Sequence, residues 1–568
     1  MTSRLSRRAL LAMATAALVV IAVALGACGD DDKSSETKAP ATSGKFGNAG
    51  GGGGPGASDT VGTGKIIADL GFRPDANSFK FENYGGGTGN KDMTAAEVRR
   101  IFGDQVCSSL HGNNCILTPP AQQWLEQSNQ IMDGGHCYGF SVATLRLFKG
   151  EIKVSQFGAD TITALEIANN EALQREIGYS FIFQTFDSVN NGVLKGTPNE
   201  MLDKMIEIFS KGKDERETYT IGFFKLEGGG GHAVTPYAVE DRGDGKFGVL
   251  IYDNNYPLVA RDIIFDRNAN TWIYNAATNP NEPSSEYKGN AESKSLQLMP
   301  TTPGTSQQPC PFCAGSGGGG SAAGLAAGPT YNEIYLDANP ADHGHLVITD
   351  AQGRRTGYVN NKLVNDIPGA KVDQSFMNDD WRINDEPSYR IPTGIGFTVT
   401  IDGSPLKKAD TENVVMIGPG YDIGIDSIEL QPGQKDTITF SPDGRSITYK
   451  SSQTESPTII VGLDGTDADY EFEVKSVKAP AGATITVNLD TAGKALSVNT
   501  SGAGTYAMAL TRITSDDEQS FSHEKIALAA DDVATLMYGN WKSNKSAIPL
   551  VVKHKGGTSD TIQLTDED

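Results

Sequence analysis

The chain has 568 residues. A single hydrophobic core rarely extends over so many residues, so we expect two or three domains. Its 70 acidic residues outnumber the 48 Lys and Arg residues and give a formal net charge of -22 at pH 7. Because nucleic acids and anionic lipid surfaces attract basic proteins, this charge argues against either as a binding partner.

A secretion signal is predicted at the N-terminus. Arg4, Arg7 and Arg8 precede an apolar stretch that ends in Leu-Gly-Ala-Cys at Cys28. This order resembles a bacterial lipoprotein signal, which implies removal of residues 1–27, a lipid on the Cys28 thiol and a membrane-anchored protein outside the cytoplasm, at the cell surface. The alternative is an uncleaved membrane anchor, because the apolar run is almost long enough to span a bilayer.

Two low-complexity segments divide the rest of the chain. Residues 28–64 are mostly small, polar or charged and predict a disordered tether. Residues 314–330 are rich in Gly and Ala and predict a linker. The expected domains are therefore 65–313 and 331–568.

The first domain mixes helical and strand patterns. Apolar residues recur at helical spacing in four segments: 95–102, 120–132, 140–148 and 199–209. Three later segments have strand composition: 219–225, 232–239 and 247–253. A helical half followed by a strand-rich half predicts an α+β domain.

The second domain is predicted to be all-β. Short alternating runs are separated by Asp-Gly, Pro-Gly and Pro-Asp-Gly turns, a pattern typical of β-sandwiches, here two modules. The alternating runs are 346–349, 437–440, 446–449, 470–474, 485–489 and 506–510.

The cysteine spacing predicts two local disulfides and one free thiol. With Cys28 lipidated, five cysteines remain in an oxidising compartment. The simplest pairing joins Cys107 to Cys115 and Cys310 to Cys313, which leaves Cys137 over. Spacing alone does not fix connectivity, and Cys310-Pro311-Phe312-Cys313 could instead be redox-active or half of a zinc site.

The segment GGHCYGFS at residues 134–141 is typical of a nucleophile site. Its two glycines permit a tight turn, and the amphipathic run from Phe140 starts directly after Cys137. A thiol at a helix N-terminus beside a cationic base is activated as a nucleophile. A structural thiol or half-cystine at Cys137 is the alternative interpretation.

Cys137-Tyr138-Gly139-Phe140-Ser141 resembles the nucleophile segment of papain-like cysteine peptidases. The family's upstream cysteine is Gly134 here. The segment 228–257, with its His-Ala-Val, hairpin and Asp-Asn order, is similar to the papain-like domains of bacterial bacteriocin-processing peptidases. A papain-like fold for residues 65–313 is therefore expected.

The resemblance implies a role for each candidate residue. Cys137 would be the nucleophile, His232 its base and then the acid for the leaving group, and Asp253 the orienting partner of His232. Asn254 and Asn255 are the alternative orienting residues. Gln130 would donate to the oxyanion, and His136 is a rival base. This chemistry requires no cofactor or metal.

The second domain offers no catalytic motif. Residues 344–370 resemble a β-sandwich module of exported bacterial proteins, which implies a spacer or adhesive role. Asp464, Asp467 and Asp469 are an alternative calcium site, although their spacing differs from an EF-hand loop. His343 and His345 have no evident metal partner in the sequence.

Two functions are expected from these features. The first is a surface lipoprotein that cleaves peptide or amide bonds, with a peptide or protein as substrate and a membrane as its anchor. The same triad could instead transfer the acyl group to an amine, as transglutaminases do. The second function is a noncatalytic surface binding protein that keeps a papain-like scaffold.

Overall fold

The computed structural model describes residues 60–86, 88–225, 231–276, 285–313, 330–339, 342–373, 386–475, 477–541 and 546–567. These residues belong to one compact unit, Gly51–Asp568. Cys28, the predicted signal and most of the predicted tether and linker lie outside the described ranges. None of the helices in those ranges is both long and apolar enough to cross a membrane.

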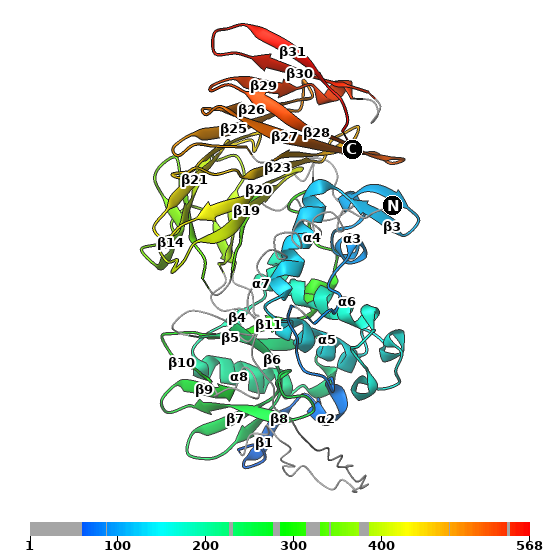
Figure 1. Cartoon of the computed structure of the whole chain (residues 1–568). Coiled ribbons are helices and arrows are strands. Elements are labelled where there is room, and N and C mark those ends of the chain that lie inside the picture. The colour runs from blue at the N-terminus through cyan, green and yellow to red at the C-terminus, as the bar shows by residue number, and fades with distance from the viewer. Residues whose placement is uncertain are drawn as a thin grey trace, which may run out of the picture. The chain divides into compact units, whose positions relative to one another are not determined.

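The first part of the chain contains helices and antiparallel strands, as predicted (Figure 1). Helix α3 begins where Thr94 and Glu97 form a capping box, and α8 begins with Pro198 after a second capping box at Thr197. The helices are α2 (Pro74–Asn77), α3 (Ala95–Phe102), α4 (Pro119–Met132), α5 (Cys137–Lys149), α6 (Glu171–Phe181), α7 (Asp187–Asn190) and α8 (Pro198–Phe209).

One antiparallel sheet of nine strands follows the order β10-β9-β8-β7-β6-β5-β11-β4, and β1 pairs with β6. Strands β6 and β7 form the hairpin predicted from the Asp-Arg-Gly-Asp-Gly turn. The strands are β1 (Lys65–Asp69), β4 (Leu194–Lys195), β5 (Tyr219–Phe224), β6 (Gly231–Asp241), β7 (Lys246–Tyr252), β8 (Ala260–Asp266), β9 (Thr271–Ala276), β10 (Ser285–Asn290) and β11 (Leu296–Pro300).

Helix α5 packs closely between α6 and the sheet. A Cβ atom at Gly139 would lie 2.3 Å from the Ile177 carbonyl oxygen of α6, so only glycine allows this approach. On the sheet side, the Ser141 and Thr235 hydroxyl groups are hydrogen-bonded at 2.8 Å between α5 and β6. These contacts set the position of the first turn of α5 relative to β6.

Both predicted disulfides are confirmed. Cys107 is bonded to Cys115 across the small hairpin of β2 (Cys107–His111) and β3 (Asn114–Leu117), and Cys310 is bonded to Cys313. Cys137 is a free, buried cysteine. Because the Cys310 and Cys313 sulfurs are bonded to each other, neither is a zinc-ligating thiolate here, and the redox-active alternative stays a prediction.

The second part of the chain consists of two antiparallel sheets, as predicted for an all-β region. One has nine strands and the other eleven, and side chains from both sheets form a common apolar core. In each of the two sheets, strand pairing is continuous from the first strand to the last. The two predicted modules would therefore share both sheets and are not separate sandwiches.

The nine-stranded sheet of the second part has the order β16-β17-β12-β19-β20-β23-β24-β27-β28. Its strands are β12 (Tyr331–Asp337), β16 (Lys371–Asp373), β17 (Ser388–Pro392), β19 (Asp410–Gly418), β20 (Tyr421–Leu430), β23 (Thr458–Leu463), β24 (Asp469–Lys475), β27 (Gly504–Ile513) and β28 (Glu518–Leu528).

The eleven-stranded sheet has the order β15-β14-β13-β18-β21-β22-β25-β26-β29-β30-β31. Its strands are β13 (His345–Asp350), β14 (Arg355–Val359), β15 (Lys362–Asn365), β18 (Phe397–Asp402), β21 (Lys435–Phe440), β22 (Ser446–Lys450), β25 (Thr484–Asp490), β26 (Ala495–Thr500), β29 (Val533–Leu536), β30 (Ile548–Lys553) and β31 (Ser559–Leu564).

Candidate functional site

The candidate nucleophile is the first residue of α5. Gly135 has a φ of 114°, a backbone conformation that favours glycine, and so turns the chain into the helix. Cys137 follows two residues later, after the N-cap His136, and is 0% exposed. The positive end of a helix dipole lies at this terminus, which favours a negatively charged group there.

The β6–β7 hairpin brings His232 and Asp253 together. Thr235 pairs with Tyr252, so the start of β6 lies beside the residue that follows β7. His232 Nε2 donates to Asp253 Oδ1 at 2.8 Å, and both side chains are buried. The two residues therefore form a charge-assisted pair inside the protein.

The Cys137 side chain lies close enough to the His232 imidazole to help raise the pKa of that ring. Asp253 occupies Nε2, whereas Nδ1 is buried without a hydrogen-bond partner. Nδ1 is therefore the ring nitrogen that remains for a base toward Cys137. The three predicted residues thus meet in the order Cys137, His232, Asp253, although 95 residues of sequence separate the first two.

The charges of this group reinforce one another. Burial disfavours the charged form of His232, but the Asp253 carboxylate and the Cys137 side chain outweigh it and raise the pKa of His232 well above its usual range. Burial would likewise raise the pKa of Asp253, yet the His232 imidazolium and its hydrogen bond hold that pKa below its usual range. The imidazolium–carboxylate form of the pair is therefore favoured.

Two residues that the sequence analysis missed support Asp253. The Tyr274 hydroxyl of β9 donates to Asp253 Oδ2 at 2.5 Å, and Arg261 Nε of β8 donates to the Tyr274 oxygen at 2.9 Å. Arg261 also lies over the Tyr256 ring, 4.0 Å from its centroid. No local motif marks either residue, because strand pairing across the sheet is what brings them to the site.

Asn254 and Asn255, the alternative orienting residues, do not form the hydrogen bond to His232 that this role requires in the described structure. The Asn254 side chain donates to the Cys137 carbonyl oxygen at 3.1 Å and to the Ala233 carbonyl oxygen at 2.9 Å. The Asn255 backbone N–H donates to Asp253 Oδ1 at 3.0 Å. Asn254 therefore joins the start of α5 to β6, and Asp253 is the residue that contacts His232.

Gln130 lies near the end of α4, and its side-chain amide donates to Asp337 of β12. This hydrogen bond engages the amide that an oxyanion donor would need. The oxyanion role of Gln130 stays a prediction.

His136 is engaged elsewhere. Its Nδ1 is 2.8 Å from the Tyr84 carbonyl oxygen, and its Nε2 is 2.8 Å from Asp92 Oδ1. Both ring nitrogens therefore bind groups other than the neighbouring thiol, and His232 holds the position of a base toward Cys137.

Two of the three aspartates of the alternative calcium site, Asp467 and Asp469, have protein partners. Asp467 forms an ion pair with Lys494, and Asp469 accepts from the Gly465 N–H at 2.9 Å and from the Ser108 hydroxyl. These contacts account for both carboxylates without an ion.

No protein-family model, curated protein or solved structure matches this chain.

Proposed function

We propose that residues 65–313 form a papain-like thiol hydrolase that cleaves peptide or amide bonds. The observation that carries this proposal is the buried hydrogen bond from His232 to Asp253, with the free Cys137 at the start of α5 close enough to His232 to raise its pKa. A free thiol at a helix N-terminus, a base and a carboxylate that orients the base are the groups that nucleophilic acyl transfer needs. Each alone is common, but the approach of the first residue of α5 to the His232–Asp253 pair of the β6–β7 hairpin argues for a site.

The proposed reaction begins from a Cys137 thiolate beside the His232 imidazolium, the pair that results when the Cys137 proton resides on His232. The sulfur attacks the carbonyl carbon of the substrate, and the His232 imidazolium then donates its proton to the departing amine. A water molecule next attacks the thioester, His232 accepts the proton of that water, and the carboxylic acid leaves. Asp253 stabilises the imidazolium throughout, with its own position held by Tyr274.

One observation favours the alternative, a noncatalytic binding protein with a papain-like scaffold. Cys137 is 0% exposed and His232 is 1% exposed, so a peptide reaches the sulfur only after neighbouring groups move. The hydrolase proposal therefore requires that reagents in solution gain access to Cys137.

Alkylation of Cys137 distinguishes the two functions. The purified protein is treated with iodoacetamide at about pH 6 without reductant, where an ordinary thiol reacts slowly, and labelled cysteines are identified by mass spectrometry. We expect rapid labelling of Cys137 alone, slowed by His232→Ala and unaffected by the control His111→Ala. An unlabelled Cys137, or labelling independent of His232, would remove the hydrolase proposal.

Hydrolysis itself is tested with an active-site-directed thiol probe and a peptide library. We expect cleavage that Cys137→Ser abolishes. Labelling of Cys137 without cleavage of any library member would favour an acyl-transfer reaction to an amine, which the same library detects when an amine acceptor is added.

We further propose that the protein is an extracytoplasmic lipoprotein held to a membrane by a lipid on Cys28. The support is the order of basic, apolar and Leu-Gly-Ala-Cys segments. The test is the distribution of the protein between membrane and soluble fractions. We expect the wild-type protein in the membrane fraction and Cys28→Ser in the soluble fraction. An N-terminal peptide of the wild type with the mass of the unmodified sequence would contradict the proposal.

A further inference from the structure

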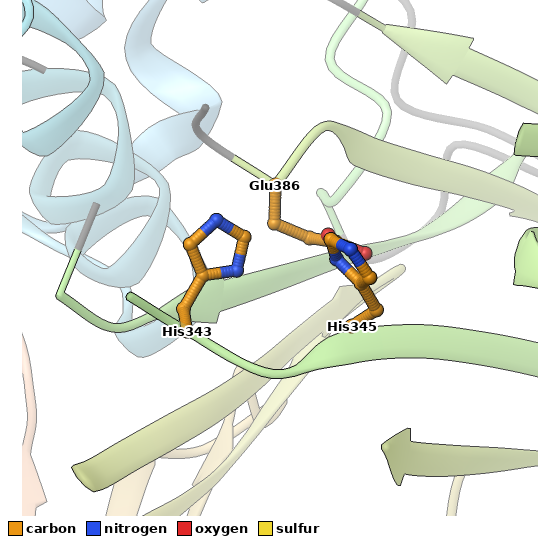
Figure 2. A group of neighbouring side chains, drawn as sticks. All are labelled: His343, His345 and Glu386. Carbon is orange, nitrogen blue, oxygen red and sulfur yellow. The ribbon is translucent and has the colours of Figure 1, made fainter. Parts of the chain in front are cut away.

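Three side chains of the second part of the chain, none of them in the candidate thiol site, form a compact group of metal-ligating atoms. His343, His345 and Glu386 each contribute one such atom, and these atoms lie within 4.8 Å of one another. Figure 2 shows the Glu386 carboxylate against the His345 ring, with the His343 ring beside them. Neither histidine has an evident metal partner in the sequence, and in the structure Glu386 from a distant segment lies beside them.

The protein already orients two of these groups. Glu386 Oε1 accepts from the Tyr389 hydroxyl at 2.6 Å and from the Leu346 N–H at 2.9 Å, while Oε2 is 2.8 Å from His345 Nδ1. The His345 ring also stacks on Tyr358, with 4.1 Å between ring centroids. Outer contacts of this kind hold metal ligands in position.

A second carboxylate lies next to this group. Glu412 of β19 is 0% exposed, and its Oε1 accepts from the Gly344 N–H at 2.5 Å. Its Oε2 is buried without a hydrogen-bond partner. This oxygen lies beside Gly344, the residue between the two histidines, because a Cβ atom there would be 2.9 Å from it. A buried oxygen left without a donor is costly, and a cation would satisfy it.

We propose that His343, His345 and Glu386 bind one Zn²⁺ ion, with the buried Glu412 carboxylate beside Gly344 as a second negative charge next to the site. Two neutral imidazoles and two carboxylates balance the charge of a divalent ion, which makes a buried site possible. Nitrogen ligands together with carboxylate oxygens suit zinc, whereas calcium takes oxygen ligands in larger number.

The position of the group indicates a structural role. His345 begins β13 of the eleven-stranded sheet, while Glu412 lies on β19 and Glu386 just before β17, both strands of the nine-stranded sheet. A bound ion would therefore join the two sheets of the β region. Binding to the folded protein alone stabilises it by mass action.

Zinc binding to the full-length protein tests this proposal. The protein, purified in detergent and stripped with a chelator, carries Cys137→Ser so that zinc at the thiol site does not contribute. After addition of Zn²⁺ and gel filtration, we expect one zinc per chain by elemental analysis and a higher thermal midpoint. Co²⁺ in its place should give the visible absorption of a tetrahedral ion. Retention of no zinc would overturn the proposal.

Ligand variants assign the site. We expect His345→Ala and Glu386→Gln each to weaken zinc binding by about tenfold or more, an effect typical of disrupted metal sites. The control is His523→Ala, which removes an imidazole of β28 that contacts the Thr565 carbonyl oxygen. Equal zinc binding by the ligand variants and the control would overturn the assignment. Should His345→Ala not fold, Glu386→Gln and the Co²⁺ spectrum of the unaltered site still decide it.

Discussion

The Tyr274 hydroxyl donates to Asp253 Oδ2, the carboxylate oxygen that His232 does not use. The two donors together fix the plane of the carboxylate and, through it, the orientation of the imidazole toward Cys137. Tyr274 and Arg261, from two further strands, thus support the three residues that the sequence predicted.

We predict that Tyr274→Phe slows both alkylation of Cys137 and any peptide cleavage by about tenfold or more. The variant removes a hydrogen bond to a charged group, typically worth about 1.5–3 kcal/mol. The control is Tyr506→Phe, which deletes a buried hydroxyl of the β region that has no hydrogen-bond partner. Unchanged alkylation in Tyr274→Phe would show that Asp253 does not need this support.

The pair of His232 and Asp253 should stabilise the protein most between about pH 4 and pH 6.5. The raised pKa of His232 gives a stabilisation that is complete below its unfolded value of about 6.5 and is lost as pH rises through the folded value. The lowered pKa of Asp253 gives one that is present above about 3.9 and is lost as pH falls through the folded value.

Denaturant titrations of the wild type and Asp253→Asn across this pH range provide the measurement. The difference in unfolding free energy should be largest inside the window and should shrink toward alkaline pH. A difference that grows as pH rises above 6.5 would contradict the pairing.

Glu176→Gln should destabilise the helical layer by about 1–3 kcal/mol, since it removes the nearest carboxylate partner of the buried Arg146 and leaves it the Glu151 carboxylate at 3.8 Å. Arg146 Nη1 is 2.5 Å from Glu176 Oε1, and the Arg146 side chain is only 4% exposed. Arg100, which also contacts Glu176 at 2.6 Å, loses a partner as well. Chemical unfolding measures the effect. The control is Glu207→Gln, which removes one partner of the exposed Lys204–Glu207 ion pair. Equal unfolding midpoints for the two variants would refute the prediction.

Gly139→Ala should cost about 1–3 kcal/mol, the usual range for an overpacked core, because the added Cβ would meet the Ile177 carbonyl oxygen at 2.3 Å. The shift of α5 should also slow alkylation of Cys137, two residues away. Gly556→Ala is the matched control, since nothing lies within 4 Å of the Cβ position there. Thermal unfolding and alkylation are measured on both variants, and a fully stable, fully reactive Gly139→Ala protein would argue against tight α5–α6 packing.

Local sequence was sufficient where a signal acts over a few residues. The apolar spacing of residues 95–102 predicted α3 with its observed bounds, because a capping box at Thr94 also marks its start. Prediction started α5 at Phe140, but the helix begins at Cys137, since the turn at Gly135 sets its first residue. Short spacing likewise predicted both disulfides.

Contacts between distant segments were decided by the tertiary structure. Pattern and resemblance selected Cys137, His232 and Asp253, yet the contact of Asp253 rather than Asn254 with His232 depends on how the chain leaves β7. Neither Tyr274 nor Arg261 has a local signature, because strand pairing sets which side chains meet across a sheet. The tertiary structure also brings Glu386 to His343 and His345. The geometry of such a group depends on the folded chain, whereas helix caps and turns depend only on neighbouring residues.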